Sequence, residues 1–334
     1  MKNKVAILFR VNADVALGLG HVSRCRSLML ALSRLADCSF AVMTNNRDVV
    51  HRALSGIDCD LHEAGEAIQG TRFDAAIIDV PDAGGVKENF RAIADLIVCV
   101  DDSGPGLDDQ DILIRPNLLN LPRPAGMPAD RYWKGQVILH PDFGTQPSPL
   151  PIERTPGIRE LFVCFGGSDP CGITLRVVEV LKRLDQDVLI RIILGAAFPW
   201  DEKLTLLLGR DARFLVARNI PDMARVLRRA DVALISGGTL LYEACASGVP
   251  SVVICQNEEQ LSEAEAAHAA GAVISLGMSA KVPDEKILST VLRLSADVPL
   301  RQKMARRGKS LVAPDGAARL AARLLSSLRK REVA

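Results

Sequence analysis

Short runs of apolar residues alternate along the chain with segments of helical periodicity. The runs lack the polar alternation of a half-exposed sheet, which indicates parallel sheets covered on both faces. They are Lys4–Phe9, Ser39–Met43, Ala75–Asp79 and Leu96–Val100 in the first half, and Leu161–Phe165, Val188–Leu194, Ala212–Ala217, Val232–Ser236 and Ser251–Cys255 in the second. The pattern predicts an α/β protein in which helices cover parallel strands.

Three segments between and after these runs are predicted to be helices. Apolar residues recur every three or four positions from Val22 to Leu35 and again from Met223 to Ala230. This spacing places them on one face of an amphipathic helix. The last segment, Gly316 to Lys330, is rich in Ala, Leu and Arg and is also expected to be helical.

The chain is expected to fold as two domains. Its 334 residues exceed what one small core fills, and the strand–helix alternation restarts after residue 157. Residues 146–157 have no periodic pattern, and prolines are frequent in them, which is typical of a linker. These prolines are Pro147, Pro149, Pro151 and Pro156. We therefore expect a first domain over residues 1–145, a linker over 146–157 and a second domain over 158–334.

Composition narrows the functions that this chain can have. It carries 41 Lys and Arg against 40 Asp and Glu, a net charge of +1, whereas nucleic-acid binding needs a basic excess. Aromatic residues make up 4% of the chain, too few for platforms that stack single-stranded bases. The apolar run from Val5 to Phe9 is too short for a signal peptide, and no later run approaches the ~18 residues of a membrane helix. We expect a cytoplasmic protein, monomeric and not inserted in a membrane.

The first candidate site lies between the first strand and the first long helix. Arg10 and Asn12 follow that strand, and Gly18, Gly20 and His21 precede the helix. Parallel α/β sheets bind ligands at the carboxyl ends of their strands, and glycines allow the backbone to approach a ligand closely. His21 is a candidate general base at the start of the helix. A capping histidine in a tight turn is the alternative.

Two glycine loops in the second half form the next candidate site. Phe165-Gly166-Gly167-Ser168 and Ser236-Gly237-Gly238-Thr239 each follow a strand and precede a helix, where backbone amides bind phosphate groups. Glu243 lies one helical turn beyond Thr239 and can accept both hydroxyls of a ribose. Plain turns and a surface glutamate are the alternatives. Two such loops in one domain favour a nucleoside diphosphate.

Two further polar segments are weaker candidates. The loop that starts at Cys255 contains Glu259 and Gln260, which can bind sugar hydroxyls or form an ordinary polar loop. Asp101 and Asp102 are adjacent acids, but neighbouring side chains point in different directions and no third ligand accompanies them. We expect a solvated turn or a helix cap there, and no metal.

In this order, the motifs resemble a known protein family. Arg10–Cys25 reads R-V-x-A-x-x-x-x-G-x-G-H-V-x-R-C, and Ser236–Pro250 reads S-G-G-T-x-x-Y-E-x-x-x-x-G-x-P. Between them stand Asp101-Asp102, Tyr132, L-H-P-D-F (Leu139–Phe143), F-G-G-S-D-P (Phe165–Pro170) and N-I-P-D-M (Asn219–Met223). From Lys4 to Gly277 the chain is similar to the UDP-2,4-diacetamido-2,4,6-trideoxy-β-L-altropyranose hydrolases of pseudaminic acid synthesis and to the SpsG proteins of spore-coat polysaccharide synthesis.

The second half also resembles the lipid-linked N-acetylglucosaminyl transferase of peptidoglycan synthesis. That wider family has the GT-B fold, with two Rossmann-like domains whose parallel sheets face each other across a cleft. The resemblance implies that His21 activates a water molecule for attack at the anomeric carbon of the sugar. It also implies that Glu243 binds the ribose and that the backbone of Asn219-Ile220 meets the uracil, with no metal or other cofactor required. The substrate-binding set expected on these grounds is Arg10, Asn12, Gly18, Gly20, Arg24, Phe165, Gly166, Gly167, Ser168, Asn219, Ile220, Ser236, Gly237, Gly238, Thr239, Glu243, Glu259 and Gln260.

Departures from the family pattern cluster where the sugar is expected. Asn12 replaces an aspartate, His140 replaces an arginine, Glu259 replaces an asparagine, and Arg115-Pro116-Asn117 replaces N-Q-N. The resemblance predicts a metal-independent hydrolase that cleaves the C1–O bond of a UDP-linked diamino-trideoxy sugar with inversion. The alternatives are a GT-B glycosyltransferase that moves the sugar to a hydroxyl acceptor, a non-enzymatic protein that binds nucleotide sugars, and an epimerase of the same fold.

Overall fold

The computed structural model describes residues 4–13, 20–68, 70–80, 90–100, 111–118, 122–135, 137–145, 157–185, 187–195, 197–218, 220 and 222–332. The chain divides into two compact units. The first contains residues 1–141 together with 314–334, and the second contains residues 142–313. Each unit has its own parallel sheet and its own hydrophobic core.

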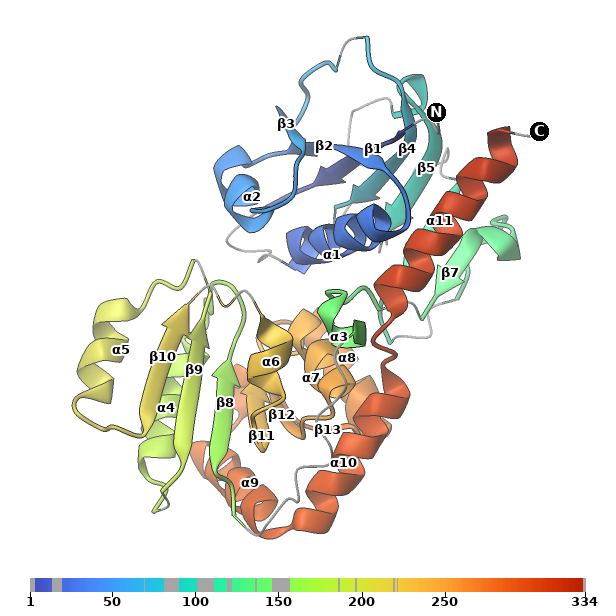
Figure 1. Cartoon of the computed structure of the whole chain (residues 1–334). Coiled ribbons are helices and arrows are strands. Elements are labelled where there is room, and N and C mark those ends of the chain that lie inside the picture. The colour runs from blue at the N-terminus through green and yellow to red at the C-terminus, as the bar shows by residue number, and fades with distance from the viewer. Residues whose placement is uncertain are drawn as a thin grey trace. The chain divides into compact units, whose positions relative to one another are not determined.

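The first domain is built on a seven-stranded sheet, in the order β3-β2-β1-β4-β5-β6-β7 (Figure 1). Its strands are β1 (Val5–Val11), β2 (Cys38–Thr44), β3 (Asp60–Glu63), β4 (Phe73–Asp79), β5 (Ala94–Val100), β6 (Ile112–Arg115) and β7 (Tyr132–Lys134). Neighbouring strands run parallel throughout. The helices of this domain are α1 (Gly20–Leu35), α2 (Arg47–Ala53) and α11 (Gly316–Glu332), with short 3-10 turns η1 (Phe90–Ala92) and η2 (Ala129–Arg131).

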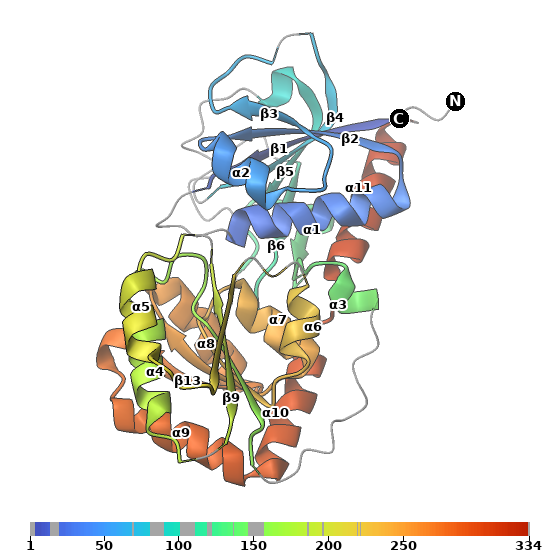
Figure 2. The same cartoon turned by 60° about the vertical axis from the view of Figure 1, so that its left-hand side comes forward.

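The last helix of the chain belongs to the first domain. Figure 2 shows α1 and α11 on the same side of the first sheet, and the buried side chains of α11 join the core formed by β1 and α1. These side chains are Ala317, Leu320, Ala321, Leu324 and Leu325. At Gly316 an added Cβ atom would lie 2.0 Å from the carbonyl oxygen of Val137, so the helix can begin there only with glycine.

This arrangement differs from the expected boundary, in which the second domain ran to residue 334. Helical periodicity establishes that Gly316 to Lys330 has an apolar face, but it does not tell which sheet that face covers. Chain position alone favours the second domain for this helix, because the segment follows the strands of that domain in the sequence. Residues 146–156 of the expected linker lie outside the described residues.

The second domain contains a six-stranded parallel sheet in the order β10-β9-β8-β11-β12-β13. Its strands are β8 (Glu160–Cys164), β9 (Leu189–Leu194), β10 (Phe214–Arg218), β11 (Val232–Ile235), β12 (Ser251–Cys255) and β13 (Val273–Met278). Its helices are α3 (Asp142–Thr145), α4 (Ile173–Lys182), α5 (Asp201–Leu208), α6 (Met223–Leu227), α7 (Thr239–Ser247), α8 (Glu258–Ala269), α9 (Asp284–Ala296) and α10 (Val298–Leu311), with a 3-10 turn, η3 (Ser279–Lys281). Buried side chains of α4, α5 and α9 pack with these strands in one core.

The predicted parallel α/β architecture is confirmed in both domains. Each apolar run that the pattern marked as a strand coincides with a strand of the structure, while β3, β6, β7 and β13 were not foreseen. Three of these four strands have only three or four residues, too few for a pattern to be recognised. Both sheets have the strand order of Rossmann-like domains, which reverses between β1 and β4 and between β8 and β11. Ligands of such sheets bind at the carboxyl ends of the strands where the order reverses.

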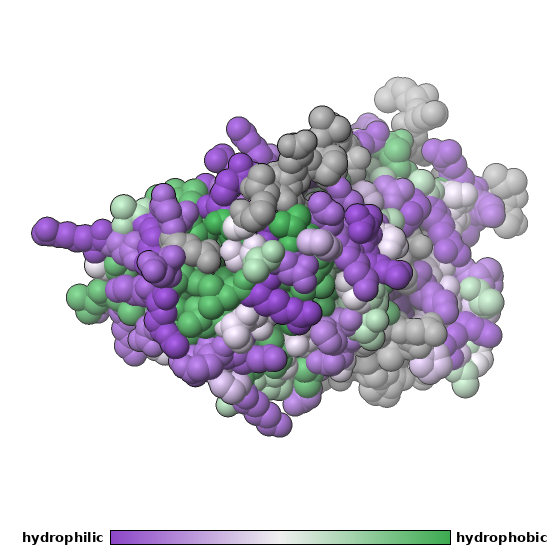
Figure 3. Space-filling view, turned by 90° about the horizontal axis from the view of Figure 1, so that it is seen from below, coloured by the Kyte–Doolittle hydropathy of each residue, from purple (hydrophilic) through white to green (hydrophobic). Residues whose placement is uncertain are grey.

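Few large apolar side chains are exposed in the part of the chain that the structure describes. In the view of Figure 3, apolar residues gather in one area and are bordered by polar residues. The large apolar side chains that are most exposed in the described chain are Leu35, Leu206, Leu215, Val216 and Leu292, on α1, α5, β10 and α9. Among the described helices, none combines the length and the apolar character needed to span a bilayer.

Candidate functional site

A histidine–aspartate pair lies where the strand order of the first sheet reverses. His21 is the second residue of α1, which follows β1, and Asp79 is the last residue of β4. The two strands are neighbours in the sheet, and the His21 Nδ1 atom lies 2.6 Å from Asp79 Oδ1. Asp79 is 1% exposed, whereas the His21 side chain keeps 20% of its surface accessible. The pair thus combines a buried carboxyl with an imidazole that solvent or a ligand can reach.

Arg24, one turn further along α1, engages the same carboxylate. Its Nε atom donates to Asp79 Oδ2 at 2.6 Å, and its Nη2 atom donates to Asp79 Oδ1 at 2.5 Å. The thiol of Cys25 donates to Asp79 Oδ2 at 3.6 Å. Burial alone would raise the pKa of Asp79, but the charges and hydrogen bonds of Arg24 and His21 together lower that pKa to about 2. Asp79 is therefore a carboxylate at neutral pH.

This geometry determines which nitrogen of His21 is available. A carboxylate can only accept hydrogen bonds, so His21 Nδ1 carries the proton and donates it to Asp79, and the lone pair of the neutral ring is then on Nε2. A histidine held in this tautomer by a buried carboxylate is the arrangement of a general base. Sequence reasoning found His21 but missed Asp79. The available signal was an acid at the end of the predicted strand Ala75–Asp79, but the order of the strands in the sheet was not known.

The end of β1 provides more polar groups. Arg10 is 6% exposed, and its Nη1 atom donates to Asn12 Oδ1 at 2.5 Å and to the carbonyl oxygen of Val11 at 3.4 Å. The backbone N–H of Ala13 donates to Asn45 Oδ1 at 2.8 Å, which links the segment after β1 to the segment after β2. Of the other predicted residues here, Gly20 begins α1, and Gly18 lies outside the described residues.

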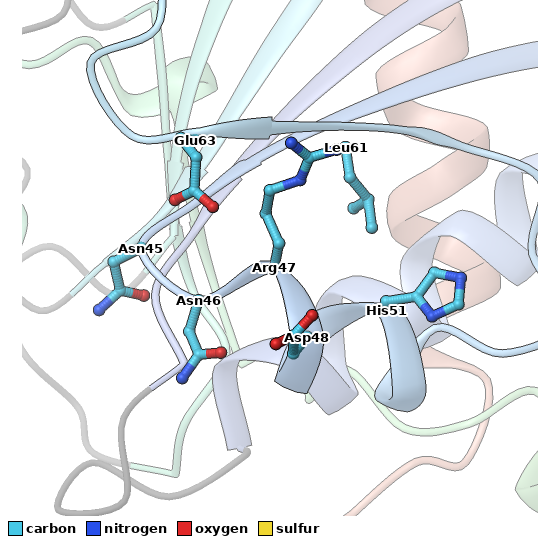
Figure 4. Close-up of a pocket in the computed structure, with 7 residues that line it drawn as sticks. All are labelled: Asn45, Asn46, Arg47, Asp48, His51, Leu61 and Glu63. Carbon is cyan, nitrogen blue, oxygen red and sulfur yellow. The ribbon is translucent and has the colours of Figure 1, made fainter.

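A polar pocket of about 540 Å³ lies beside this segment, at the carboxyl ends of β2 and β3 (Figure 4). It is lined by Asn45, Asn46, Arg47, Asp48, His51, Leu61 and Glu63. In the view of Figure 4, Asn45, Asn46 and Glu63 stand on one side and His51 on the other. Within the described part of the chain, the side chains of Arg47, Asp48, His51 and Glu63 make no hydrogen bond or ion pair. Their charged and polar groups therefore remain available to a ligand. Sequence reasoning missed this pocket because the lining residues come from two strands and a helix.

The two predicted glycine loops meet where the strand order of the second sheet reverses. Gly166 follows β8 and Ser236 follows β11, and a Cβ atom on Gly166 would lie 3.8 Å from Ser236 Oγ. Gly166 has a φ of +89°, which favours glycine. Ser168 and Ser236 are buried, whereas Gly167 and Thr239 are partly buried. The Phe165 side chain is 1% exposed and lies in the hydrophobic core, so only the backbone of this residue is available at the glycine loops.

The helices behind these two loops differ at their first turns. The carboxylate of Asp169 accepts the backbone N–H groups of Ile173 at 2.9 Å and Thr174 at 2.7 Å, so the start of α4 already holds an anion. At the start of α7, Gly238 is the N-cap and no side chain caps the helix. The open amides and the positive end of the helix dipole at α7 favour a phosphate group. Of the two predicted nests, the one before α7 is therefore the better anion site.

Glu243 lies on α7, one turn after Thr239. It is partly buried, and its carboxyl group makes no hydrogen bond or ion pair with the described residues. Burial raises its pKa to about 8. A carboxyl that is withdrawn from water and has no protein partner can accept the hydroxyl groups of a ligand.

The polar residues after β12 mainly hold the loops together. Gln256 donates from Nε2 to the carbonyl oxygen of Phe165 at 2.8 Å, and its N–H donates to Gln260 Oε1 at 2.9 Å. A Cβ atom on Gly237 would lie 2.4 Å from the Gln260 carbonyl oxygen, so this glycine is required for the two loops to pack closely. Glu259 is exposed in the first turn of α8.

The remaining predicted residues are only partly described. Ile220 is partly buried, and Asn219 lies outside the described residues, as do Asp101 and Asp102. In the described part of the chain, no group of three or more His, Cys, Asp or Glu side chains is placed to hold a metal ion. The structure thus brings the predicted residues together in two sets, one at the carboxyl edge of each sheet.

Comparison with known proteins adds to this description. No protein-family model matches the chain. The spore coat polysaccharide biosynthesis protein SpsG of Bacillus subtilis (strain 168) is 25% identical over 331 residues, which cover 95% of this chain and 96% of SpsG. The chain is therefore similar to SpsG along nearly its whole length. The resemblance that the motifs predict is thus confirmed.

A second relative of this chain is a UDP-N-acetylglucosamine–N-acetylmuramyl-(pentapeptide) pyrophosphoryl-undecaprenol N-acetylglucosamine transferase of Sorangium cellulosum (strain So ce56). It is 32% identical over 127 residues, which cover 36% of this chain and 31% of the transferase.

Two solved structures resemble the chain in fold. MurG of Acinetobacter baumannii has a TM-score of 0.63 at 15% identity and covers 97% of this chain and 100% of its own. The UDP-GlcNAc 2-epimerase of Neisseria meningitidis, in complex with UDP-GlcNAc, has a TM-score of 0.62 at 14% identity over 97% of this chain and 100% of its own. These likenesses confirm the GT-B fold expected from the resemblance, with two Rossmann-like domains.

Proposed function

We propose that this chain is a cytoplasmic enzyme of surface polysaccharide biosynthesis that acts on a UDP-linked amino sugar and releases the free sugar by inverting hydrolysis. The observation that carries the proposal is the His21–Asp79 pair at the reversal of strand order in the first sheet. The similarity to SpsG supports the polysaccharide context, and the transferase and epimerase relatives support a UDP-sugar as substrate.

In the proposed reaction, His21 acts as the general base. Its Nε2 atom accepts a proton from a water molecule while the water oxygen forms a bond to the anomeric carbon of the sugar. The C1–O bond to UDP breaks from the opposite face, so the anomeric configuration inverts and the bond electrons leave with the diphosphate. Asp79 stabilises the imidazolium that forms, and the ring then returns the proton to solvent.

The second domain provides the groups for the nucleotide in this proposal. The open first turn of α7, with Gly238 and Thr239, stabilises the charge that develops on the leaving diphosphate. Glu243 accepts the ribose hydroxyls, and Asn219-Ile220 meets the uracil, as the family resemblance implies. In this proposal the backbone amides at the start of α7 stabilise the leaving charge, so the reaction requires no metal ion.

A second candidate is glycosyl transfer, in which an acceptor hydroxyl replaces water. The polar pocket lined by Asn45, Arg47, Asp48 and Glu63 favours it, because the pocket lies at the same sheet edge as His21 and carries charged and amide groups suited to a hydroxylated acceptor. The hydrolase remains our conclusion, since His21 needs only water to complete the reaction.

One experiment separates these functions. The purified chain is incubated with a small panel of UDP-diamino sugars and no acceptor, and the anomeric proton is followed by NMR. Hydrolysis predicts free sugar of inverted anomeric configuration together with UDP. No UDP release without an acceptor would favour transfer, a new sugar still attached to UDP would indicate epimerisation, and a stably bound intact UDP-sugar would indicate a binding protein.

The role of His21 gives a direct prediction. His21→Ala is expected to reduce UDP release by at least about a hundredfold, because general-base catalysis contributes roughly 10²–10⁴. Its affinity for UDP should stay within a few-fold of that of the unaltered chain, since the proposed nucleotide groups lie in the second domain. UDP release by this variant at an undiminished rate would refute the assignment of the base.

A further inference from the structure

The Asp79 carboxylate has two opposing effects on His21 as a base. A carboxylate 2.6 Å from Nδ1 orients the imidazole, but its negative charge also favours the doubly protonated imidazolium. An imidazolium has no lone pair on Nε2 and cannot accept a proton from water. A histidine–aspartate pair that works as a base near neutral pH therefore needs the carboxylate charge to be balanced.

Arg24 is placed to balance it. Its guanidinium donates to both oxygens of Asp79, at 2.6 and 2.5 Å, which is the bidentate geometry of strong arginine–carboxylate pairs. Its Nη2 atom also lies 3.0 Å from His21 Nδ1. A fixed positive charge at this distance opposes a second positive charge on the ring. The Arg24 side chain is 16% exposed, so water screens this interaction only in part.

Among the described residues, the other side chain that contacts Asp79 is uncharged. The thiol of Cys25 touches Asp79, and burial together with the nearby Asp79 charge raises the pKa of this thiol well above its usual value, so it stays neutral. Among the described residues, the charged groups that contact the His21 ring are thus Asp79 from β4 and Arg24 from α1.

We propose that Arg24 is a positioning residue that keeps His21 neutral and its Nε2 atom unprotonated by sharing the Asp79 carboxylate. Arg24 was expected among the substrate-binding residues; in this proposal its guanidinium acts through Asp79 on His21 and not on the substrate. The inference rests on the proposed function, because His21 has to be neutral only if it acts as the general base. The state of the ring itself can be measured without any turnover.

The test is NMR of the full-length chain with ¹³C- and ¹⁵N-labelled histidine. The chain has five histidines, and the signals of His21 are identified by their loss in His21→Gln. In Arg24→Met at neutral pH, the ¹⁵N signals of His21 are expected to move from those of the neutral ring, with its proton on Nδ1, towards those of the imidazolium, because the Asp79 charge is then unopposed. Arg24→Lys should restore part of the change. Arg26→Met is the matched control, since Arg26 lies on the same helix and its guanidinium donates to the Ser55 carbonyl oxygen and not to Asp79 in the described structure.

A second pair of variants distinguishes the proposed effect of Arg24 from a folding defect in Arg24→Met. In Asp79→Asn no carboxylate charge favours the imidazolium, so the His21 ring should stay neutral at neutral pH both with and without Arg24→Met. A neutral His21 ring in Arg24→Met at neutral pH, or an imidazolium in both backgrounds, overturns the proposal. Lost UDP affinity with unchanged His21 protonation would return Arg24 to the substrate-binding set. Absence of UDP release from the unaltered chain contradicts the proposed function and leaves the NMR result standing.

Discussion

Asp79 and Glu243 are both withdrawn from water, yet their pKa values move in opposite directions. Asp79 has Arg24 and His21 as partners, which lower its pKa to about 2 against the effect of burial. Glu243 has no partner among the described residues, and burial raises its pKa to about 8. The first carboxyl is therefore charged at neutral pH, and the second is largely protonated. Partners decide the charge of a buried acid, because desolvation acts on both in the same direction.

Glu243 makes stability depend on pH. Its pKa is about 8 in the folded chain against an ordinary 4.5, so the unfolded chain loses its proton first as the pH rises. The free energy of unfolding is therefore expected to fall between about pH 4.5 and pH 8. Glu243→Gln should remove this fall and be more stable than the unaltered chain at pH 8.5, by roughly 1–3 kcal/mol, with little difference at pH 4.5.

Urea unfolding at pH 4.5, 6.5 and 8.5 measures this effect. Glu259→Gln, at an exposed glutamate of α8, is the control and should follow the pH profile of the unaltered chain. The same pH profile in Glu243→Gln and the unaltered chain would contradict a raised pKa at Glu243.

At the scale of elements, the two helices that follow the glycine loops differ in how the backbone N–H groups of their first turns are bound. α4 is capped by Asp169, whose backbone has a φ of +41° and whose carboxylate binds two N–H groups of the first turn. α7 starts without a side-chain cap. The Asp169 carboxylate already occupies the N-terminal amides of α4, so these amides cannot bind a diphosphate strongly. The cap of α4 therefore mainly stabilises the domain, and the N-terminus of α7 remains available to a ligand.

Asp169→Ala is expected to lower the free energy of unfolding by about 1–2 kcal/mol, because it removes a buried cap and places alanine at positive φ. Asp169→Asn should cost less, since asparagine tolerates this backbone conformation and keeps one acceptor. Asp297→Ala, which removes the cap of α10, is the matched control and should cost about 1 kcal/mol without affecting UDP. If α7 binds the diphosphate, UDP affinity should change only a few-fold in Asp169→Ala; a loss of a hundredfold would move the site to α4.

At the scale of the whole molecule, the two domains have separate cores, and the chain crosses between them twice. The first core contains Leu324 of α11 together with residues of β1 and α1, and the second contains Leu294 of α9. The first domain is therefore complete only when the last 21 residues, 314–334, have been added to residues 1–141.

Leu324→Ala should destabilise the first domain selectively, by about 2–5 kcal/mol, because Leu324 is 2% exposed and its truncation leaves a cavity. Hydrogen exchange with mass spectrometry should show faster exchange in β1, β2 and α1, while peptides from β8 to β12 exchange as before. Leu294→Ala, in the second core, is the matched control with the opposite pattern. Equal acceleration in both domains by Leu324→Ala would show that the cores are not independent.

Local patterns in the sequence determined the elements, and the tertiary structure decided their partners. The apolar runs, the glycine loops and His21 could be recognised because strand length, helical spacing and backbone freedom are local properties. Asp79, the polar pocket and the place of α11 could not, because they depend on which strands become neighbours and which sheet an apolar face covers. His21 alone is an imidazole at the start of a helix; β4 beside β1 brings Asp79 to it, and Arg24 then balances the charge.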